Sequence, residues 1–158
     1  MTCPGLLSAP YHVGIATTDV DGAKAALGAV LGLTWVALER PPIWHYTPDG
    51  AVRPSPRVEY SAGGPLHVEL LESALGTVYS PAAGTHVHHL GYWTDDFAGD
   101  LEAALADGWS LEASMQDEDG IPSTFCYLTC PGRMRVELVD SARRPDFEAL
   151  MKRGNQAR

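Results

Sequence analysis

The feature of the sequence that most constrains its fold is an internal repeat. Residues 12–19 read HVGIATTD and residues 89–96 read HLGYWTDD, at a separation of 77 positions. A second pair of segments, VELLE at 68–72 and VELVD at 136–140, lies at a separation of 68 positions. Similarity between two halves of one chain indicates that one supersecondary unit is used twice. We therefore expect two related modules.

Each repeat has the sequence pattern of a strand followed by a capped helix. Asp19 and Asp96 come directly after the first strand of each half, where an aspartate can accept hydrogen bonds from the free N–H groups of a helix. Apolar residues then recur with helical spacing, and Gly32 or Gly108 follows at a position suited to the left-handed conformation that ends helices. Further strands are predicted at residues 34–38, 66–72, 110–115 and 134–140. Each half therefore has the predicted order β-α-β-β-β.

The first half carries an insertion, because the separation between the repeats falls from 77 to 68 positions along the chain. We assign it to residues 40–57, where five prolines lack amide donors and exclude a continuous central strand. A chain of 158 residues has the length of one domain. The predicted organisation is a single domain of residues 1–158, with a first module at 10–72, a second module at 86–140, and a C-terminal helix and tail at 141–158. The helix is expected to begin near Pro145 and to give way to a polar end from Gly154.

The charge and hydropathy of the chain argue against two classes of partner. Eleven Lys and Arg against twenty Asp and Glu give a formal net charge of −9, which repels phosphate backbones and anionic lipids. No apolar run approaches the ~18 residues that span a bilayer, and the first ten residues lack the basic and apolar regions of a secretion signal. We therefore expect a cytoplasmic protein that binds neither nucleic acid nor a membrane.

Four side chains occupy equivalent places in the two repeats. His12 and His89 begin the first strand of each half, and Glu69 and Glu137 lie in the last strand of each half. If the halves pack with pseudo-twofold symmetry, these four side chains converge. Two imidazoles and two carboxylates suit a divalent first-row metal, and glutamate is rarely buried without a partner. The glycine two positions after each histidine is expected to leave room for a ligand.

The motifs HVGIATTDV, HVELLES, HHLGYWTDD and MRVELVD, in this order, resemble those of the vicinal oxygen chelate superfamily. This superfamily includes glyoxalase I, methylmalonyl-CoA epimerase, extradiol dioxygenases and bleomycin resistance proteins, and the likeness covers about residues 10–140. It implies an α+β fold in which two βαβββ modules, related by pseudo-twofold symmetry, form a curved mixed sheet around a metal-binding cavity. In such families the metal-binding histidine immediately precedes the apolar strand, which selects His12 and His89. His86 and His88 are then expected to be solvent-side or rim residues, with contact between His88 and a substrate left open.

The chain is most similar to the branch of glyoxalase I and methylmalonyl-CoA epimerase, which takes a histidine and a glutamate or glutamine from each module. The likeness implies that His12, Glu69, His89 and Glu137 bind one divalent ion, which could be Mn, Fe, Co, Ni or Zn. It also implies an isomerase, epimerase or lyase that moves a proton next to a carbonyl through a metal-stabilised enolate. Glu137 or Glu69 would then be both ligand and catalytic base.

Two other functions remain open from the sequence, a metal-dependent dioxygenase and a non-catalytic protein that sequesters a small molecule. Methylmalonyl-CoA itself is disfavoured as the substrate, because the insertion stands where the epimerase carries an additional glutamate. Family members often dimerise, so a homodimer is one expected arrangement.

The expected partner is a small molecule with carbonyl or carboxylate oxygens. The candidates for its pocket are Trp44, His45, Tyr46, His67, Trp93, Tyr127 and Arg135. The three residues from the insertion are expected to form a lid or edge that suits an apolar or ring-bearing substrate. Arg135 either binds a substrate carboxylate or pairs with a neighbouring glutamate.

Overall fold

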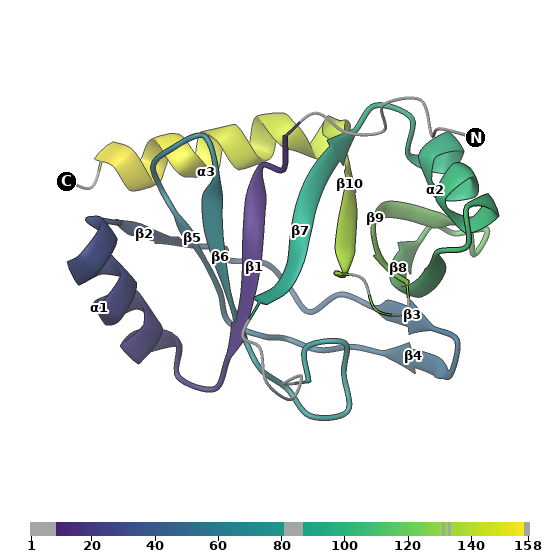
Figure 1. Ribbon diagram of the computed structural model, residues 1–158, viewed down its shortest axis with the longest axis horizontal. Helices are drawn as coiled ribbons and strands as arrows, with labels where there is room; N and C mark the ends of the chain where they lie inside the picture. The colour runs from purple at the N-terminus through teal and green to yellow at the C-terminus, as the bar shows by residue number, and fades with distance from the viewer. Residues whose placement is uncertain (1–8, 81–86, 131, 133, 157–158) are drawn as a thin grey trace.

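One curved mixed sheet of ten strands organises the computed structural model, which describes residues 9–80, 87–130, 132 and 134–156 (Figure 1). The strands, in chain order, are β1 (His12–Thr17), β2 (Trp35–Ala37), β3 (His45–Thr47), β4 (Gly50–Val52), β5 (Val58–Ser61), β6 (His67–Glu72), β7 (Val87–Thr94), β8 (Ser110–Gln116), β9 (Pro122–Thr129) and β10 (Val136–Asp140). The α-helices are α1 (Val20–Leu31), α2 (Phe97–Ala106) and α3 (Arg144–Gln156).

The strand order shows the repeat directly, because the sheet reads β2-β5-β6-β1-β7-β10-β9-β8-β3-β4. In the first half β1 pairs in parallel with β6, and β5 and β2 follow outward in antiparallel pairs. In the second half β7 pairs in parallel with β10, and β9 and β8 follow in the same way. The two halves meet where β1 and β7 pair antiparallel at the centre. The predicted fold of two βαβββ modules is confirmed.

The insertion forms a hairpin that joins the first module to the second. Strands β3 and β4 pair antiparallel, and Tyr46 on β3 pairs with Ser114 on β8. Figure 1 shows β2 and β3 at opposite ends of the molecule, so residues 38–44 cross from one module to the other. The prolines agree with this placement, because all five lie outside the two short strands that end this side of the sheet.

Helices α1 and α2 begin at the aspartates that the sequence predicts. The Asp19 side chain accepts a hydrogen bond from the Gly22 amide at 2.8 Å, and the Asp96 side chain accepts one from the Gly99 amide at 3.1 Å. Gly32 ends α1 with a φ of +65°, a conformation that a side chain disfavours. Helix α1 packs on β6, whereas α2 packs on β8, β9 and β10.

Helix α3 runs across β2 and β5 and is longer than the sequence suggests. It continues to Gln156, so Gly154, predicted to begin a polar tail, is a buried helical residue. A Cβ atom at Gly154 would lie 2.7 Å from the Cβ of Ala62 and 3.0 Å from that of Val36. The glycine therefore allows the helix to lie close to the sheet. None of the helices in the described part of the chain is both long and apolar enough to cross a membrane.

Candidate metal centre

The two histidines face each other across the central strand pair. In the antiparallel register, His12 pairs with Gly91 and His89 pairs with Gly14. A Cβ atom at Gly91 would lie 1.9 Å from the His12 ring, and one at Gly14 would lie 2.1 Å from the His89 ring. The glycines expected to leave room for a ligand thus leave room for the imidazole of the opposite module.

The two glutamates reach the same point from the neighbouring strands. The Nε2 atom of His12 lies 3.4 Å from Oε2 of Glu69 and 3.2 Å from Oε2 of Glu137. The Nε2 atom of His89 lies 3.2 Å and 3.4 Å from the same two oxygens, and the two Nε2 atoms are 2.6 Å apart. We call His12, Glu69, His89 and Glu137 the His-Glu cluster. The structure brings together all four residues that the repeat singles out.

The cluster fits a divalent cation by its chemistry and by its burial. Ligand atoms of His12, His89 and Glu137 all lie within 4.8 Å of one another. The Oε2 atom of Glu69 is buried and accepts no hydrogen bond from the residues that the structure describes. Buried carboxylates are usually paired or bound to a metal, and two imidazoles with two carboxylates form a donor set for first-row metals.

The cluster also creates a strongly negative field around the two imidazoles. Burial lowers the pKa of His12, but Glu69 and Glu137 raise it to about 9. The same two carboxylates raise the pKa of His89 above its usual value, against the effect of burial. Burial raises the pKa of each glutamate, but the two histidines hold both values below the ordinary range. At neutral pH the carboxylates are ionised, which favours a cation between them.

His88, which the sequence places at the rim, is a buried support of His89. Its Nε2 atom lies 2.7 Å from the Val78 carbonyl oxygen and therefore donates to it, because a carbonyl only accepts. Its Nδ1 atom, 2.9 Å from Nδ1 of His89, then accepts a hydrogen bond. Burial lowers the pKa of His88 to about 4, so this ring stays neutral. His89 is thereby held with its Nε2 lone pair toward the cluster, the tautomer that a metal ligand requires. His86 lies outside the described residues.

The two glutamates differ in their support. The Tyr60 hydroxyl donates a hydrogen bond to Oε1 of Glu69. Tyr127 occupies the matching position opposite Glu137, but its ring packs against Tyr79 and no hydrogen bond joins its hydroxyl to Glu137 in the described part of the chain. Burial raises the pKa of both Tyr60 and Tyr127, so both hydroxyls are protonated at neutral pH. Glu69 is therefore fixed by a tyrosine and Glu137 is not, within the part of the chain that the structure describes.

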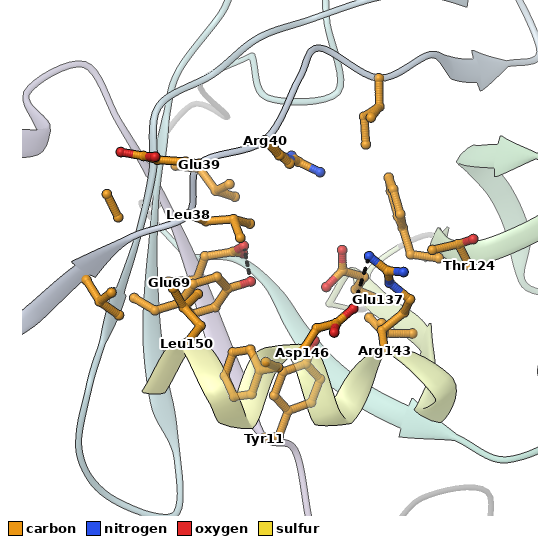
Figure 2. Close-up of a pocket in the computed structure, with 18 of the residues that line it drawn as sticks. Tyr11, Leu38, Glu39, Arg40, Glu69, Thr124, Glu137, Arg143, Asp146 and Leu150 are labelled. Carbon is orange, nitrogen blue, oxygen red and sulfur yellow. Dashed lines mark hydrogen bonds and ion pairs between the residues drawn. The ribbon is translucent and has the colours of Figure 1, made fainter. Parts of the chain in front are cut away.

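A cavity of about 1080 Å³ lies beside the cluster, between the sheet and helix α3. Glu69 and Glu137 line it, and the imidazoles of the cluster are fully buried. Figure 2 shows both carboxylates in the wall, with the guanidinium of Arg40 pointing into the cavity. The cavity is mainly apolar and rich in aromatic rings, which suits an organic ligand with a few polar groups.

The predicted pocket residues are divided between this cavity and other places. Trp93 and Tyr127 line it. The other five candidates are absent from its described lining: Trp44, His45, Tyr46, His67 and Arg135. Arg135 makes two hydrogen bonds of 2.6 Å to Glu112, which is the ion-pair alternative that the sequence leaves open. Nδ1 of His67 lies 2.7 Å from the Ser61 carbonyl oxygen.

The insertion contributes to the cavity through a different segment from the one expected. Trp44 is half exposed, with the Arg53 guanidinium 5.8 Å from its ring, and His45 is buried. The preceding segment, residues 38–43, supplies lining residues instead, Arg40 among them. The hairpin register explains the difference, because pairing at the sheet edge fixes residues 45–47 away from the cavity. Nothing in the local sequence pattern marks Arg40.

A pseudo-twofold pair of βαβββ modules that brings a histidine and a glutamate from each half to one point beside a cavity defines a recognisable class of protein. The family model of the glyoxalase/bleomycin resistance protein/dioxygenase superfamily matches residues 11–127. The chain therefore belongs to this superfamily, as its motifs predict.

Three of the similar solved structures illustrate the range of this fold. Methylmalonyl-CoA epimerase from Mycobacterium tuberculosis aligns with 89% of this chain and 92% of its own, at 18% identity and a TM-score of 0.62. A variant of the Streptomyces coelicolor epimerase, in complex with 2-nitronate-propionyl-CoA, aligns with 86% of this chain and 96% of its own, at 21% identity and a TM-score of 0.60. A variant of 4-hydroxymandelate synthase from Streptomyces coelicolor aligns with 85% of this chain but 38% of its own, at 17% identity and a TM-score of 0.60. No curated protein sequence matches the chain. These identities establish the fold alone.

Proposed function

We propose that the protein is a metal-dependent isomerase, epimerase or lyase that moves a proton at a carbon next to a substrate carbonyl. The observation that carries this proposal is the convergence of His12, Glu69, His89 and Glu137 at the wall of a large, mainly apolar cavity. We propose these four side chains as the ligands of one divalent ion, either Mn, Fe, Co, Ni or Zn. A divalent cation bound there supplies Lewis-acid stabilisation of the negative charge that forms on a substrate oxygen when the neighbouring carbon loses a proton.

Glu137 is the better candidate for the proton-transfer base. Tyr60 holds Glu69 through a hydrogen bond, which favours its ionised form and restrains its movement. Glu137 accepts no hydrogen bond from a tyrosine in the described part of the chain and lines the cavity, where a substrate carbon can approach its carboxylate. A buried carboxylate beside an apolar cavity can take a proton with little competition from water.

The similar structures support an enzyme of this class without fixing its substrate. Two of those described are methylmalonyl-CoA epimerases, whose name denotes an epimerisation. The insertion contributes Arg40, Pro41 and Ile43 to the lining of the cavity, and these residues have no counterpart in the second module. The substrate class therefore has to be inferred from this chain's own residues.

A second candidate function is a metal-dependent dioxygenase, which one observation favours. His12, His89 and Glu137 form a two-histidine, one-carboxylate group, the donor set of many iron-dependent oxygenases. The dioxygenase proposal predicts iron dependence, oxygen consumption and tolerance of Glu69→Gln. The isomerase proposal predicts that Glu69→Gln weakens metal binding and that oxygen is not consumed.

Elemental analysis tests the metal site first. Protein purified without a chelator or a histidine tag is expected to carry a first-row metal in near-stoichiometric amount. The double variant Glu69→Gln with Glu137→Gln should lose it, whereas a control with Glu112→Gln and Glu148→Gln removes two carboxylates outside the cluster and should retain it. Wild-type protein that binds none of the five metals, even after they are added back, would overturn the proposal. Deuterium exchange from solvent into carbonyl and thioester compounds then tests the reaction.

A further inference from the structure

Arg40 lies in the segment that crosses from the first module to the second. Its side chain is among the lining of the cavity, and Figure 2 shows its guanidinium pointing into the open space rather than along the wall. The neighbouring Glu39 points the opposite way, out of the cavity. Arginine presents a planar fork of donors that matches a carboxylate, so this position can bind an anion.

No carboxylate in the described part of the chain forms an ion pair with Arg40. The Tyr79 hydroxyl, a neutral group, lies beside Arg40 and also lines the cavity. Burial lowers the pKa of Arg40, while the oxygens of Tyr79, Tyr127 and Glu69 raise it above its ordinary value. The guanidinium is therefore charged and close enough to Glu69 to feel its field.

The other charges around the cavity offset one another. Arg143 and Asp146, both exposed, form an ion pair at 3.6 Å. Glu39 and Arg153 are also exposed and carry opposite charges. Arg40 is thus the half-buried charge that the rest of the lining does not balance.

The charges of the metal-loaded site indicate the charge of the organic molecule that it binds. A divalent cation offsets the two carboxylates of Glu69 and Glu137, and the histidines bind metals as neutral imidazoles. With Arg40 included, the interior then carries one positive charge. A monoanion neutralises this interior, whereas a dianion such as a phosphate monoester would leave a net negative charge in a largely apolar cavity.

We propose that Arg40 binds the carboxylate of a monoanionic organic acid whose reacting carbonyl lies at the His-Glu cluster. This inference rests on the proposed function, because the cluster supplies the second anchor. The body of the substrate is apolar or ring-bearing, since Tyr11 and Trp93 stack at 3.9 Å in the wall and Phe147 packs edge-on against them. The cavity, at about 1080 Å³, has room for such a body between the two anchors.

Calorimetric titration of the metal-loaded protein with two series of hydroxamates tests the inference. A hydroxamate chelates metals through neighbouring oxygens, and each series varies the chain length. One series ends in a carboxylate and the other in a methyl group. We expect the best carboxylate probe to bind at least about tenfold more tightly than its uncharged partner, as a charge-assisted hydrogen bond supports.

Arg40→Met should remove this preference and leave the affinity of the methyl series within about twofold, because methionine keeps the apolar stem. Arg40→Lys should retain part of the preference for the carboxylate series, since the positive charge remains but the planar set of guanidinium donors is lost. Arg143→Met is the matched control at the cavity mouth and should change the affinity of neither series.

Equal binding of the two series by the wild type, or a preference that survives Arg40→Met, would overturn the inference while the metal site stands. Failure of both series to bind the metal-loaded wild type would overturn the proposed function itself. Thermal melting of each variant checks that it folds.

Discussion

The two modules place equivalent ligands at one point but support them differently. In the second module His89 is held by His88, whereas in the first module Nδ1 of His12 is buried without a hydrogen bond from any described residue. The residue that matches His88 in the first repeat is Tyr11, which stacks on Trp93 instead. The support of the glutamates is reversed, because Tyr60 holds Glu69 of the first module and no tyrosine bonds to Glu137.

Each module therefore supplies one ligand that a neighbouring side chain holds and one that no such side chain holds. The held ligand is the glutamate in the first module and the histidine in the second, which we call the crossed arrangement. The repeat determines where the four side chains lie, since it sets strand order and register. Their neighbours determine what each of them can do. A symmetric donor set with asymmetric support is suited to a reaction in which one carboxylate stays on the metal and the other carries a proton.

The largest difference is expected between the two glutamates. Glu137→Gln should lower the rate of proton exchange at the substrate carbon by about 10²- to 10⁴-fold, because it removes the base. Glu69→Gln should mainly weaken metal binding, and excess metal should restore most of its activity. Deuterium incorporation, measured at saturating metal, distinguishes them. Equal losses of proton exchange in both variants would show that the two glutamates do not divide the roles of metal ligand and base.

Substitution of the central glycines should affect both modules alike. Gly91→Ala and Gly14→Ala each place a Cβ atom about 2 Å from a fully buried histidine ring, so the strands or rings must move. We expect each variant to lose about 1 to 3 kcal/mol of unfolding free energy, measured by urea denaturation, together with its metal. Gly28→Ala on helix α1 is the control, since its Cβ atom meets a backbone oxygen no closer than 3.3 Å. Normal stability in Gly91→Ala would contradict the close approach of His12.

The histidine supports should differ in their effect on metal affinity. His88→Phe removes the acceptor that fixes the His89 tautomer, and a loss of this kind typically weakens metal binding by about 10- to 100-fold. Tyr11→Phe, at the matching position, should change the affinity by less than about threefold, because the stacked ring is kept. Competition with a fluorescent chelator measures both. A weaker effect for His88→Phe than for Tyr11→Phe would reverse the comparison.

The smallest expected effect concerns the tyrosines. Tyr60→Phe removes the hydrogen bond to Glu69 and should weaken metal binding by about tenfold, the scale of one hydrogen bond to a charged group. Tyr127→Phe removes a hydroxyl that makes no hydrogen bond to Glu137 among the described residues, and it should leave metal affinity within about twofold. The same chelator competition serves both. Identical shifts would mean that Glu137 is also held by its tyrosine.

The sequence predicts the parts of this molecule that the repeat determines. Two modules, the caps at Asp19 and Asp96, and the convergence of the His-Glu cluster all follow from repeated motifs and strand register. His88 shows the limit of this prediction, because its burial depends on Val78 and Tyr79, which lie between the two repeats and contact it. Arg40 shows the same limit, since its position depends on where the inserted hairpin pairs. The insertion has no counterpart in the second half, so the repeat cannot predict its structure.

The pairing of the inserted hairpin with the second module also constrains the order of folding during synthesis. Strand β3 ends at Thr47 and its partner β8 begins at Ser110, so the ribosome adds roughly 60 residues between them. At about 5 to 20 residues per second, strand β8 is synthesised on the order of seconds after the hairpin that pairs with it. Short strands and nearby prolines make it a poor template for other chains during this time. The wall that carries Arg40 therefore cannot be completed before β8 has been synthesised.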